Sequence, residues 1–336
     1  MAAIKKRLLT GDRPTGRLHL GNYFGSLVNR PKLQEEYDCF FMIADLHMLT
    51  TDYDRSLELK DNIFDIAIDW ISVGMDPGRS TFFIQSEVPA HSFLQLIFSM
   101  LVTVPRLERI PTLKDKVRES RFKDEEAYSF GLLGYPVLQA ADILAYRADV
   151  VPVGEDQLSH LELTREIARR FNYIYGDIFP EPQTILSEVP RVPGIDGLNN
   201  KMSKSLNNDI SLSHGLEEVK NRVLRMVTDP ARVRSADPGH PDICTAFAFY
   251  KIFVPGEFLL DVRQECEGGR IGCVPCKERL ASIMNQMLEP IREKRAELEK
   301  NPSLVRDILY EGTRKAISVS EETAALVKEK VGLKIL

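Results

Sequence analysis

Hydrophobic residues in the N-terminal part of the chain form short continuous runs that alternate with longer segments of helical spacing. The runs are typical of parallel strands that are buried on both faces. They lie at residues 8–9, within residues 38–50, where the run ends in polar residues, and at residues 81–85 and 150–153. The longer segments predict helices at residues 56–73, 91–104 and 158–172. This alternation predicts an α/β fold with a doubly wound parallel sheet, followed by helices beyond residue 216.

A glycine-rich loop follows the first predicted strand. Residues 10–22 read T-G-D-R-P-T-G-R-L-H-L-G-N, and their glycines and proline are incompatible with a regular element. The residues after them have the character of a helix start. A strand, a glycine loop and a helix N-terminus together turn backbone N–H groups toward an anion, usually a phosphate. The loop is neither a P-loop nor the dinucleotide fingerprint.

A second candidate for phosphate binding is the sequence K-M-S-K-S at residues 201–205. It follows residues 180–200, whose prolines and glycines predict an irregular connector. Two lysines on a flexible loop can close on phosphates and then release them. Lys116 lies in a charged segment, where it is either part of a solvated helix face, which the spacing favours, or another phosphate ligand.

Tyr135, Gln139 and Asp142 have the spacing i, i+4, i+7, which places them on one face of a predicted helix. Their neighbours are apolar, and a carboxylate in such surroundings must receive a hydrogen bond from the protein or from a ligand. His47 lies at the carboxyl end of a predicted strand, as do residues 154–157. Ligands of open α/β sheets bind at such strand ends, so these residues are candidates for a binding site.

Composition and charge narrow the class of protein. The chain has 336 residues, of which 43% are hydrophobic and 28% charged, and its net charge is −5. No apolar run reaches the ~20 residues of a membrane span, and no signal peptide is evident. We therefore expect a cytoplasmic protein with no membrane and no DNA partner, in which any RNA would meet local basic surfaces.

Four of the five cysteines, Cys244, Cys266, Cys273 and Cys276, form the pattern C-x21-C-x6-C-x2-C. A disulfide framework is not expected in a cytoplasmic chain. Four thiolates can hold either a tetrahedral zinc ion or an iron–sulfur cluster. Spacing alone favours zinc, and unligated cysteines are the remaining alternative.

The sequence H-L-G-N at residues 19–22 and K-M-S-K-S at residues 201–205 resemble the two signatures of class I aminoacyl-tRNA synthetases. Residues 85–91, 135–144 and 151–165 extend the resemblance to the tryptophanyl-tRNA synthetase family, over essentially the whole chain. It implies a Rossmann-like catalytic domain at residues 1–208, in which residues 88–145 form an inserted helical part with the interface of a homodimer. It also implies a helical anticodon-binding domain at residues 209–336, which contains the cysteines, and tRNA(Trp) as partner.

The resemblance also implies roles for individual residues. Asp142 would accept the indole N–H of tryptophan, Tyr135 and Gln157 would hold its ammonium group, and His47 and Gln139 would line the pocket, although many family members have methionine in place of Gln139. ATP, with Mg²⁺, would be held by Arg13, Pro14, Thr15, Gly21, Asn22, Gly154, Glu155, Asp156, Val192, Lys201, Met202, Ser203, Lys204 and Ser205. The catalytic residues would be Lys201, Lys204, His19, Asn22 and Lys116.

Asn22 stands where the first signature usually ends in histidine, so an amide suffices there and the contact need not transfer a proton. The cysteine pattern is similar to that of a bacterial subset with C-x22-C-x6-C-x2-C and a [4Fe–4S] cluster. Because a loop absorbs one residue easily, the resemblance favours the cluster over zinc.

Two other functions remain open at this point. A tyrosyl-tRNA synthetase has a similar Tyr-x-x-x-Gln-x-x-Asp helix, although the contexts A-A-D-I-L and G-E-D-Q favour tryptophan. A non-catalytic paralogue could use the cysteines as a redox or RNA-binding sensor. The intact K-M-S-K-S sequence argues against it, because both lysines would then be dispensable.

Overall fold

The computed structural model describes residues 5–119, 128–186 and 192–333. The chain divides into two compact units. The first unit comprises Met1–Gly16, Asn29–Glu188 and Asn301–Leu336; the second comprises Arg17–Val28 and Val189–Lys300. This division differs from the predicted ranges 1–208 and 209–336. The last helix belongs with the sheet, and the helix start after the glycine loop belongs with the second unit.

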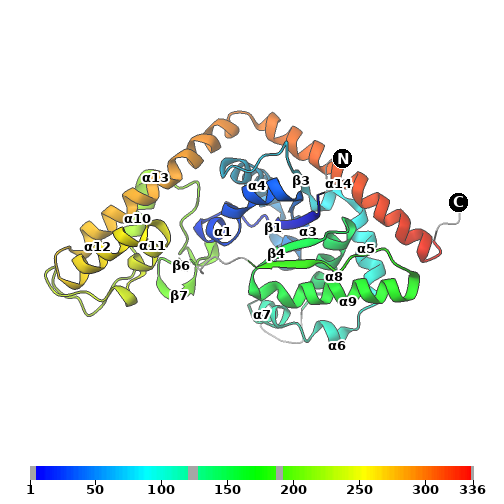
Figure 1. The fold of residues 1–336 in the computed structure, drawn as a ribbon, viewed down its shortest axis with the longest axis horizontal. Helices are drawn as coiled ribbons and strands as arrows, with labels where there is room; N and C mark the ends of the chain where they lie inside the picture. Colours follow the sequence, from blue (N-terminus) through cyan, green and yellow to red (C-terminus); the bar gives the residue numbers. More distant parts are fainter. Residues whose placement is uncertain (1–4, 120–127, 187–191, 334–336) are drawn as a thin grey trace. The chain divides into compact units, whose positions relative to one another are not determined.

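The first unit is built on a parallel five-stranded sheet with the order β3-β2-β1-β4-β5. Figure 1 labels β1, β3 and β4 of this sheet among the surrounding helices. The strands are β1 (Arg7–Asp12), β2 (Asp38–Ile43), β3 (Thr81–Ile84), β4 (Val150–Val153) and β5 (Gln183–Leu186). The doubly wound parallel sheet predicted from the sequence is confirmed. Its order reverses between β1 and β4, and open α/β sheets bind ligands beyond the strand ends at such a point.

Two details of the sheet differ from the prediction. β1 continues through Gly11 to Asp12, whereas the sequence predicted that the loop begins at residue 10. A side chain at Gly11 would collide with the Met42 carbonyl of the neighbouring strand, so glycine here serves strand pairing. The predicted connector, residues 180–200, contains β5 of the main sheet and the hairpin of β6 (Pro193–Gly194) and β7 (Gly197–Lys201).

Helices surround the sheet of the first unit. They are α2 (Arg30–Glu36), α3 (Asp45–Asp52), α4 (Leu59–Ser72), α5 (Pro89–Ser99), α6 (Val104–Leu107), α7 (Pro111–Glu119), α8 (Phe130–Ala145), α9 (Leu158–Tyr175) and α14 (Pro302–Lys330). α4 and α9 confirm the helices predicted at 56–73 and 158–172. The helix predicted at 91–104 is shorter in the structure, because α5 ends at Ser99 and a separate helix, α6, begins at Val104.

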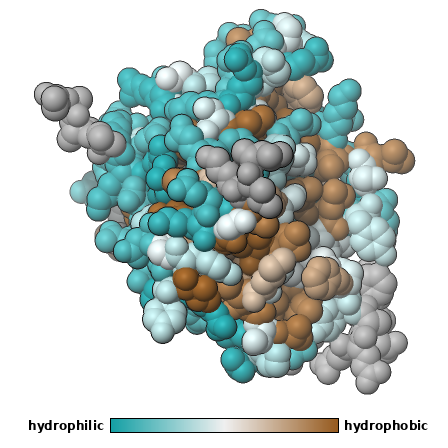
Figure 2. Space-filling model, turned by 90° about the vertical axis from the view of Figure 1, so that its right-hand side faces the viewer, coloured by the Kyte–Doolittle hydropathy of each residue, from teal (hydrophilic) through white to brown (hydrophobic). Residues whose placement is uncertain are grey.

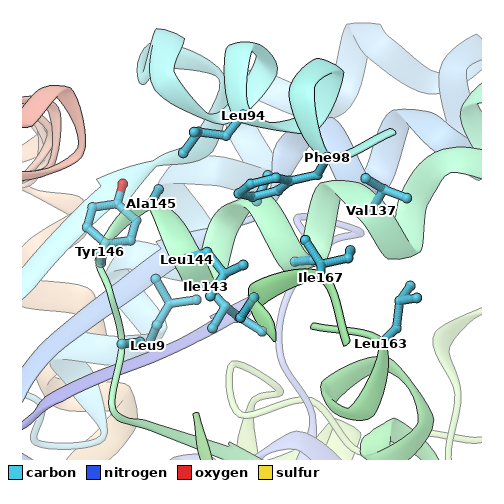
Figure 3. Packing of buried hydrophobic residues seen from close by; sticks show 14 of the residues in the cluster. Leu9, Leu94, Phe98, Val137, Ile143, Leu144, Ala145, Tyr146, Leu163 and Ile167 are labelled. Carbon is cyan, nitrogen blue, oxygen red and sulfur yellow. The ribbon is translucent and has the colours of Figure 1, made fainter. Parts of the chain in front are cut away.

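The core of the first unit is organised around α8, which is apolar on nearly all sides and therefore buried on nearly all sides. Figure 3 shows Leu94 and Phe98 of α5, Leu163 and Ile167 of α9, and Leu9 of β1 around its side chains. Because α8 packs between other helices and a strand, any polar group on it lies in a low-dielectric interior. The placement of Tyr135 and Asp142 follows from this packing.

α14 packs against the edge strand β3. At Gly312 the helix approaches the backbone of Phe82 so closely that an added Cβ would overlap the Phe82 carbonyl. Thr313, next to it, accepts a hydrogen bond from the Ile84 N–H at 3.3 Å. These contacts are the physical reason why residues 301–336 belong to the sheet unit rather than to the helical unit.

The second unit contains α1 (Leu20–Gly25), the hairpin β6–β7, α10 (Leu216–Leu224), α11 (Thr245–Phe253), α12 (Gly256–Glu267) and α13 (Cys273–Glu299). The helices confirm the helical prediction beyond residue 216. Among the residues that the structure describes, none of the helices is long and apolar enough to cross a membrane.

We predict that Gly312→Ala destabilises the protein by about 1–3 kcal/mol, because the added methyl group forces α14 away from the Phe82 carbonyl. Without that contact the same change inside a helix would stabilise by about 0.5–1 kcal/mol, so the sign is diagnostic. Urea unfolding measures it. Gly131→Ala in α8 is the matched control, because its nearest new neighbour would be Ser129 Oγ at 3.7 Å. An unchanged or raised midpoint for the Gly312 variant would contradict the packing described.

Candidate active site

Asp142 of α8 lies at the centre of a buried polar network in the first unit. Its side chain is 1% exposed, and it receives hydrogen bonds from three side chains. His91 Nδ1 lies 2.6 Å from Oδ1, His47 Nε2 lies 2.7 Å from Oδ2, and the Gln85 amide bridges both oxygens at 2.8 and 2.9 Å. Because an ionised carboxylate only accepts, we assign hydrogen to both facing ring nitrogens.

Three elements of the chain bring these donors together. Gln85 follows β3 directly, His91 lies in the first turn of α5, and His47 lies in the first turn of α3 after β2. The remaining ring nitrogen of His91 lies 2.8 Å from the Tyr146 hydroxyl, so the imidazole is held at both ends. The sequence placed Gln85 at the end of a predicted strand and His91 at the start of a predicted helix, but it did not identify either as a partner of Asp142; polar residues directly after an apolar strand were the available signal.

The network keeps Asp142 ionised. Burial would raise the pKa of this carboxyl group, but the hydrogen bond from His47 and the charge and hydrogen bond of His91 lower it to about 2. The ionised form therefore stabilises the fold above the ordinary carboxyl pKa, and this contribution is lost as the pH falls through about 2. At neutral pH Asp142 is therefore a buried anion that can only accept hydrogen bonds.

Tyr135, on the same face of α8, forms a second network. Its hydroxyl lies 2.8 Å from His160 Nε2 and 3.3 Å from Thr112 Oγ1. Burial raises the pKa of Tyr135 to about 12, and burial together with Lys116 lowers the pKa of His160 to about 4, so both groups are neutral at pH 7. The Lys116 ammonium lies 4.0 Å from the centre of the Tyr135 ring, which is cation–π geometry.

The other predicted pocket residues of the first unit lie in less buried positions. Gln139 and Gln157 are half-buried, and residues 154–156 are exposed directly after β4. A side chain at Gly154 would meet the Asp156 carboxylate at 2.8 Å, so glycine lets the turn close there. The His47 ring lies edge-on to Tyr135, with centroids 6.4 Å apart, which connects the two networks.

Arg13 is held by α3. Its guanidinium donates to the Asp52 carboxylate at 3.2 Å, to the Met48 carbonyl at 3.4 Å, and to the Thr51 hydroxyl. Pro14 is buried and Thr15 is half-buried. Arg13 therefore has hydrogen-bond partners within the protein. The role of Arg13, Pro14 and Thr15 as ATP ligands stays a prediction.

The two signature sequences lie together in the second unit. The Leu20 N–H donates to the Ile210 carbonyl at 2.9 Å, and the Leu212 N–H donates to the Leu18 carbonyl at 2.9 Å. His19 forms a bridge with Ser211 in the same pairing. The segment that carries His19 is thus joined by backbone hydrogen bonds to the segment directly after the K-M-S-K-S sequence.

His19 is a neutral imidazole at physiological pH. Burial, followed by the positive charge of Lys204, lowers its pKa to about 4. Its backbone N–H donates to Asn22 Oδ1 at 3.1 Å, so the amide of Asn22 supports the start of α1. An added Cβ at Gly21 would meet the His19 ring at 2.9 Å, and glycine therefore allows the ring to fold back over the helix start.

Asn208 fixes the shape of the K-M-S-K-S segment at residues 201–205, called the lysine loop below. Its side chain accepts from the Ser203 N–H at 2.7 Å and donates to the Lys201 carbonyl at 3.1 Å and to Asp196 at 2.8 Å. Met202 is 2% exposed, and the burial of its side chain anchors the loop. Lys201 and Ser205 are exposed, Val192 is buried, and Ser203 Oγ lies 2.9 Å from Ser205 Oγ. Sequence reasoning missed Asn208, although an amide just after a five-residue signature is a turn signal.

The four cysteines also lie in the second unit, where they influence one another electrostatically. Arg232 Nη1 lies 3.9 Å from Cys266 Sγ and 4.0 Å from Cys273 Sγ. Burial, and further thiols, raise the pKa of Cys276 to about 11. Among the residues that the structure describes, no three histidine, cysteine, aspartate or glutamate side chains are arranged as metal ligands. The donors have the chemistry of a soft-metal site, but the sulfurs do not adopt its geometry.

Comparison with known proteins identifies the family. The chain matches the family described as "tRNA synthetases class I (W and Y)" over residues 3–289. It is 48% identical to the tryptophan–tRNA ligase of Thermotoga maritima, with 97% of this chain and 99% of that protein covered. It is 41% identical to the tryptophan–tRNA ligase of Aquifex aeolicus, with coverage of 97% and 100%.

Among solved structures, the tryptophanyl-tRNA synthetase from Campylobacter jejuni complexed with ADP and tryptophan has a TM-score of 0.87 at 35% identity, over 97% of this chain and 99% of that chain. The sheet order, the paired signatures and these similarities agree. The chain therefore belongs to the tryptophan–tRNA ligases, within the class I aminoacyl-tRNA synthetases.

Proposed function

We propose that this protein activates tryptophan with ATP and then transfers it to tRNA(Trp). The observation that carries the proposal is the buried, ionised Asp142, an acceptor suited to a ring N–H, on a helix that is apolar on nearly all sides. The lysine loop beside the neutral His19 provides the phosphate-binding part. The family resemblance assigns the same roles to these residues.

The first reaction needs positioning more than proton transfer. A carboxylate oxygen of tryptophan forms a bond to the α-phosphorus, the bond from that phosphorus to the bridging oxygen breaks, and pyrophosphate leaves. Since the nucleophile is already an anion, no general base is required, and catalysis consists of orientation and stabilisation of charge on the phosphates. We assign that stabilisation to Lys201, Lys204 and Mg²⁺, with His19 and Asn22 as neutral hydrogen-bonding groups.

Lys116, which the sequence predicts as a possible phosphate ligand, also has a contact within the protein. Its ammonium packs on Tyr135, which we assign to the wall of the amino acid pocket. We therefore propose that Lys116 orders Tyr135 and acts on phosphate at most secondarily. Tyr135 and Gln157 remain the proposed partners of the substrate ammonium, and Gln139 and His47 the proposed lining.

We predict that Asp142→Asn raises the KM for tryptophan about 10- to 100-fold and leaves the KM for ATP unchanged. The reason is that a hydrogen bond to a charged acceptor contributes about 1.5–3 kcal/mol. Amino acid-dependent exchange of pyrophosphate into ATP measures both values. The wild-type protein should exchange with tryptophan and not with tyrosine.

The matched control is Asp45→Asn, which removes another buried carboxylate, one that accepts the Leu46 and Ser86 N–H groups at 3.1 and 2.9 Å. It should lower stability and keep the preference for tryptophan. Exchange with tyrosine instead would make the chain a tyrosine–tRNA ligase. If the protein binds tryptophan but shows no exchange, it is a non-catalytic paralogue. If Asp142→Asn raises the KM for tryptophan and the KM for ATP equally, Asp142 does not recognise tryptophan.

We further propose that the protein is a homodimer. Hydrophobic side chains gather on the face shown in Figure 2. In the first unit, Leu96 of α5, Met100 directly after α5 and Val104 of α6 are exposed, and α8 begins with Phe130, which is 78% exposed. Leu96 and Met100, the C-cap residue, have the spacing i, i+4. An apolar surface of this kind marks a protein interface, and it lies in residues 88–145, where the family resemblance places the dimer contact; residues 120–127 of that range lie outside the described part.

We expect the double variant Leu96→Asp, Met100→Asp to have half the wild-type mass in light scattering, because two carboxylates would have to be desolvated at the interface. Leu260→Asp, at a residue of α12 that is 59% exposed, is the control and should keep the wild-type mass. A wild-type protein that is monomeric at micromolar concentration would contradict the proposal.

We propose that Cys244, Cys266, Cys273 and Cys276 hold a [4Fe–4S] cluster, with zinc as the alternative. Their four sulfurs lie near two cations, because Cys244, Cys273 and Cys276 are close enough to influence Lys277 electrostatically, and Arg232 faces the sulfurs of Cys266 and Cys273. An added Cβ at Gly239 would overlap Cys266 Sγ, so glycine leaves room around that sulfur. Such a group would brace α11, α12 and α13, to which we assign anticodon binding.

Anaerobic purification should yield a coloured protein with about four iron and four sulfide ions per chain. Cys276→Ser should lose the colour and the iron, since thiolates hold such clusters. Cys39→Ser, which changes the buried cysteine of β2, is the control and should keep both. A colourless protein that contains one zinc per chain would establish the alternative instead.

A further inference from the structure

The carboxylate of Asp142 has no position left for another donor. Each of its oxygens has two hydrogen-bond contacts, from His91 and Gln85 on one side and from His47 and Gln85 on the other. A carboxylate offers about four lone-pair positions in total. If Asp142 is to accept a ring N–H from a ligand, one of these protein donors has to leave.

Two of the three donors are fixed. His91 is 0% exposed, and its second ring nitrogen contacts the Tyr146 hydroxyl at 2.8 Å. Gln85 is also 0% exposed, and its amide oxygen accepts the His47 backbone N–H at 3.3 Å. Moving either side chain would leave a buried polar group unpaired, which is unfavourable.

His47 differs from both. It is the most exposed of the three donors, at 9%, and it lies in the first turn of α3, where the sheet ends. Its ring contacts the Asp142 carboxylate through Nε2 and otherwise meets the edge of Tyr135 on the pocket side. Rotation of this side chain would free Oδ2 of Asp142 without breaking the hydrogen bonds of Gln85 or His91.

We propose that His47 is a displaceable partner of Asp142. It occupies the acceptor while the pocket is empty, and it gives up that place to the ring N–H of the bound substrate. The proposal rests on the assignment of Asp142 to tryptophan recognition. Its physical reason is the cost of a buried charge, which must be compensated in the empty protein as well as in the complex. Substrate binding then exchanges one hydrogen bond for another.

Displacement can be observed by NMR spectroscopy of the intact protein labelled with nitrogen-15 histidine. The protein has six histidines. The variants His47→Gln and His91→Gln identify the signals of these two. In the empty protein, the Nε2–H of His47 and the Nδ1–H of His91 should both give the downfield proton signal of an N–H bonded to carboxylate. Saturation with tryptophan should remove the His47 signal and keep the His91 signal. A His47 signal that persists in the saturated protein overturns the proposal, as does loss of the His91 signal instead.

The sign of a mutational effect gives a second test. His47→Ala should lower the melting temperature of the empty protein and tighten tryptophan binding about tenfold, because the ligand no longer displaces a charge-assisted hydrogen bond. A residue that only lines the pocket would weaken binding when truncated. His160→Ala is the matched control, since His160 is 1% exposed and contacts Tyr135 rather than Asp142. It should show no gain in affinity, and weaker binding by His47→Ala overturns the proposal.

Asp142→Asn distinguishes failure of the role assigned to Asp142 from failure of the displacement proposed for His47. If this variant keeps wild-type affinity for tryptophan, the assigned role of Asp142 fails. If it loses affinity while the His47 signal of the wild-type protein survives tryptophan saturation, Asp142 recognises the ligand and the displacement alone is wrong.

Discussion

A buried charge is the constraint on which the first unit depends. Asp142 lies on a helix that is apolar on nearly all sides, and an isolated carboxylate there would take up a proton or destabilise the fold. Donors from the ends of two strands and from the first turn of α5 compensate it. The sheet order matters for this reason, because only neighbouring parallel strands bring β2 and β3 to the same edge beside α8.

The second unit solves a different electrostatic problem. If the two lysines bind phosphates, as proposed, they must stay charged, and a neutral histidine beside them adds no further positive charge. Burial and the nearby Lys204 keep His19 neutral, and the Asn208 side chain holds the loop without neutralising either lysine. The backbone pairing of Leu18 and Leu20 with residues 210–212 then makes the histidine and the lysines parts of one structure.

The sequence predicted those features that depend on local pattern. The parallel sheet followed from apolar runs alternating with helices, and the shared face of Tyr135 and Asp142 followed from helical spacing. The donors to Asp142 could not be predicted from spacing, because Gln85 and His91 lie more than fifty residues away and meet it only through the sheet order. The unit to which α14 belongs could not be predicted either, because its amphipathic pattern suits both units. Within α14 only Gly312 indicates a close approach to another backbone segment. In both cases the missing information is which distant surface each element covers.

Selectivity in such a pocket resides in the arrangement of donors as much as in the acid itself. A carboxylate accepts from an indole N–H and from a phenol O–H alike, so Asp142 alone does not distinguish the two rings. Gln85 and His91 are fixed at both ends and occupy three of the four contacts on Asp142. His47, next to Tyr135, occupies the fourth. If a ligand ring displaces His47 as proposed, its donor must reach the position of that fourth contact, and Gln85 and His91 determine where that position lies.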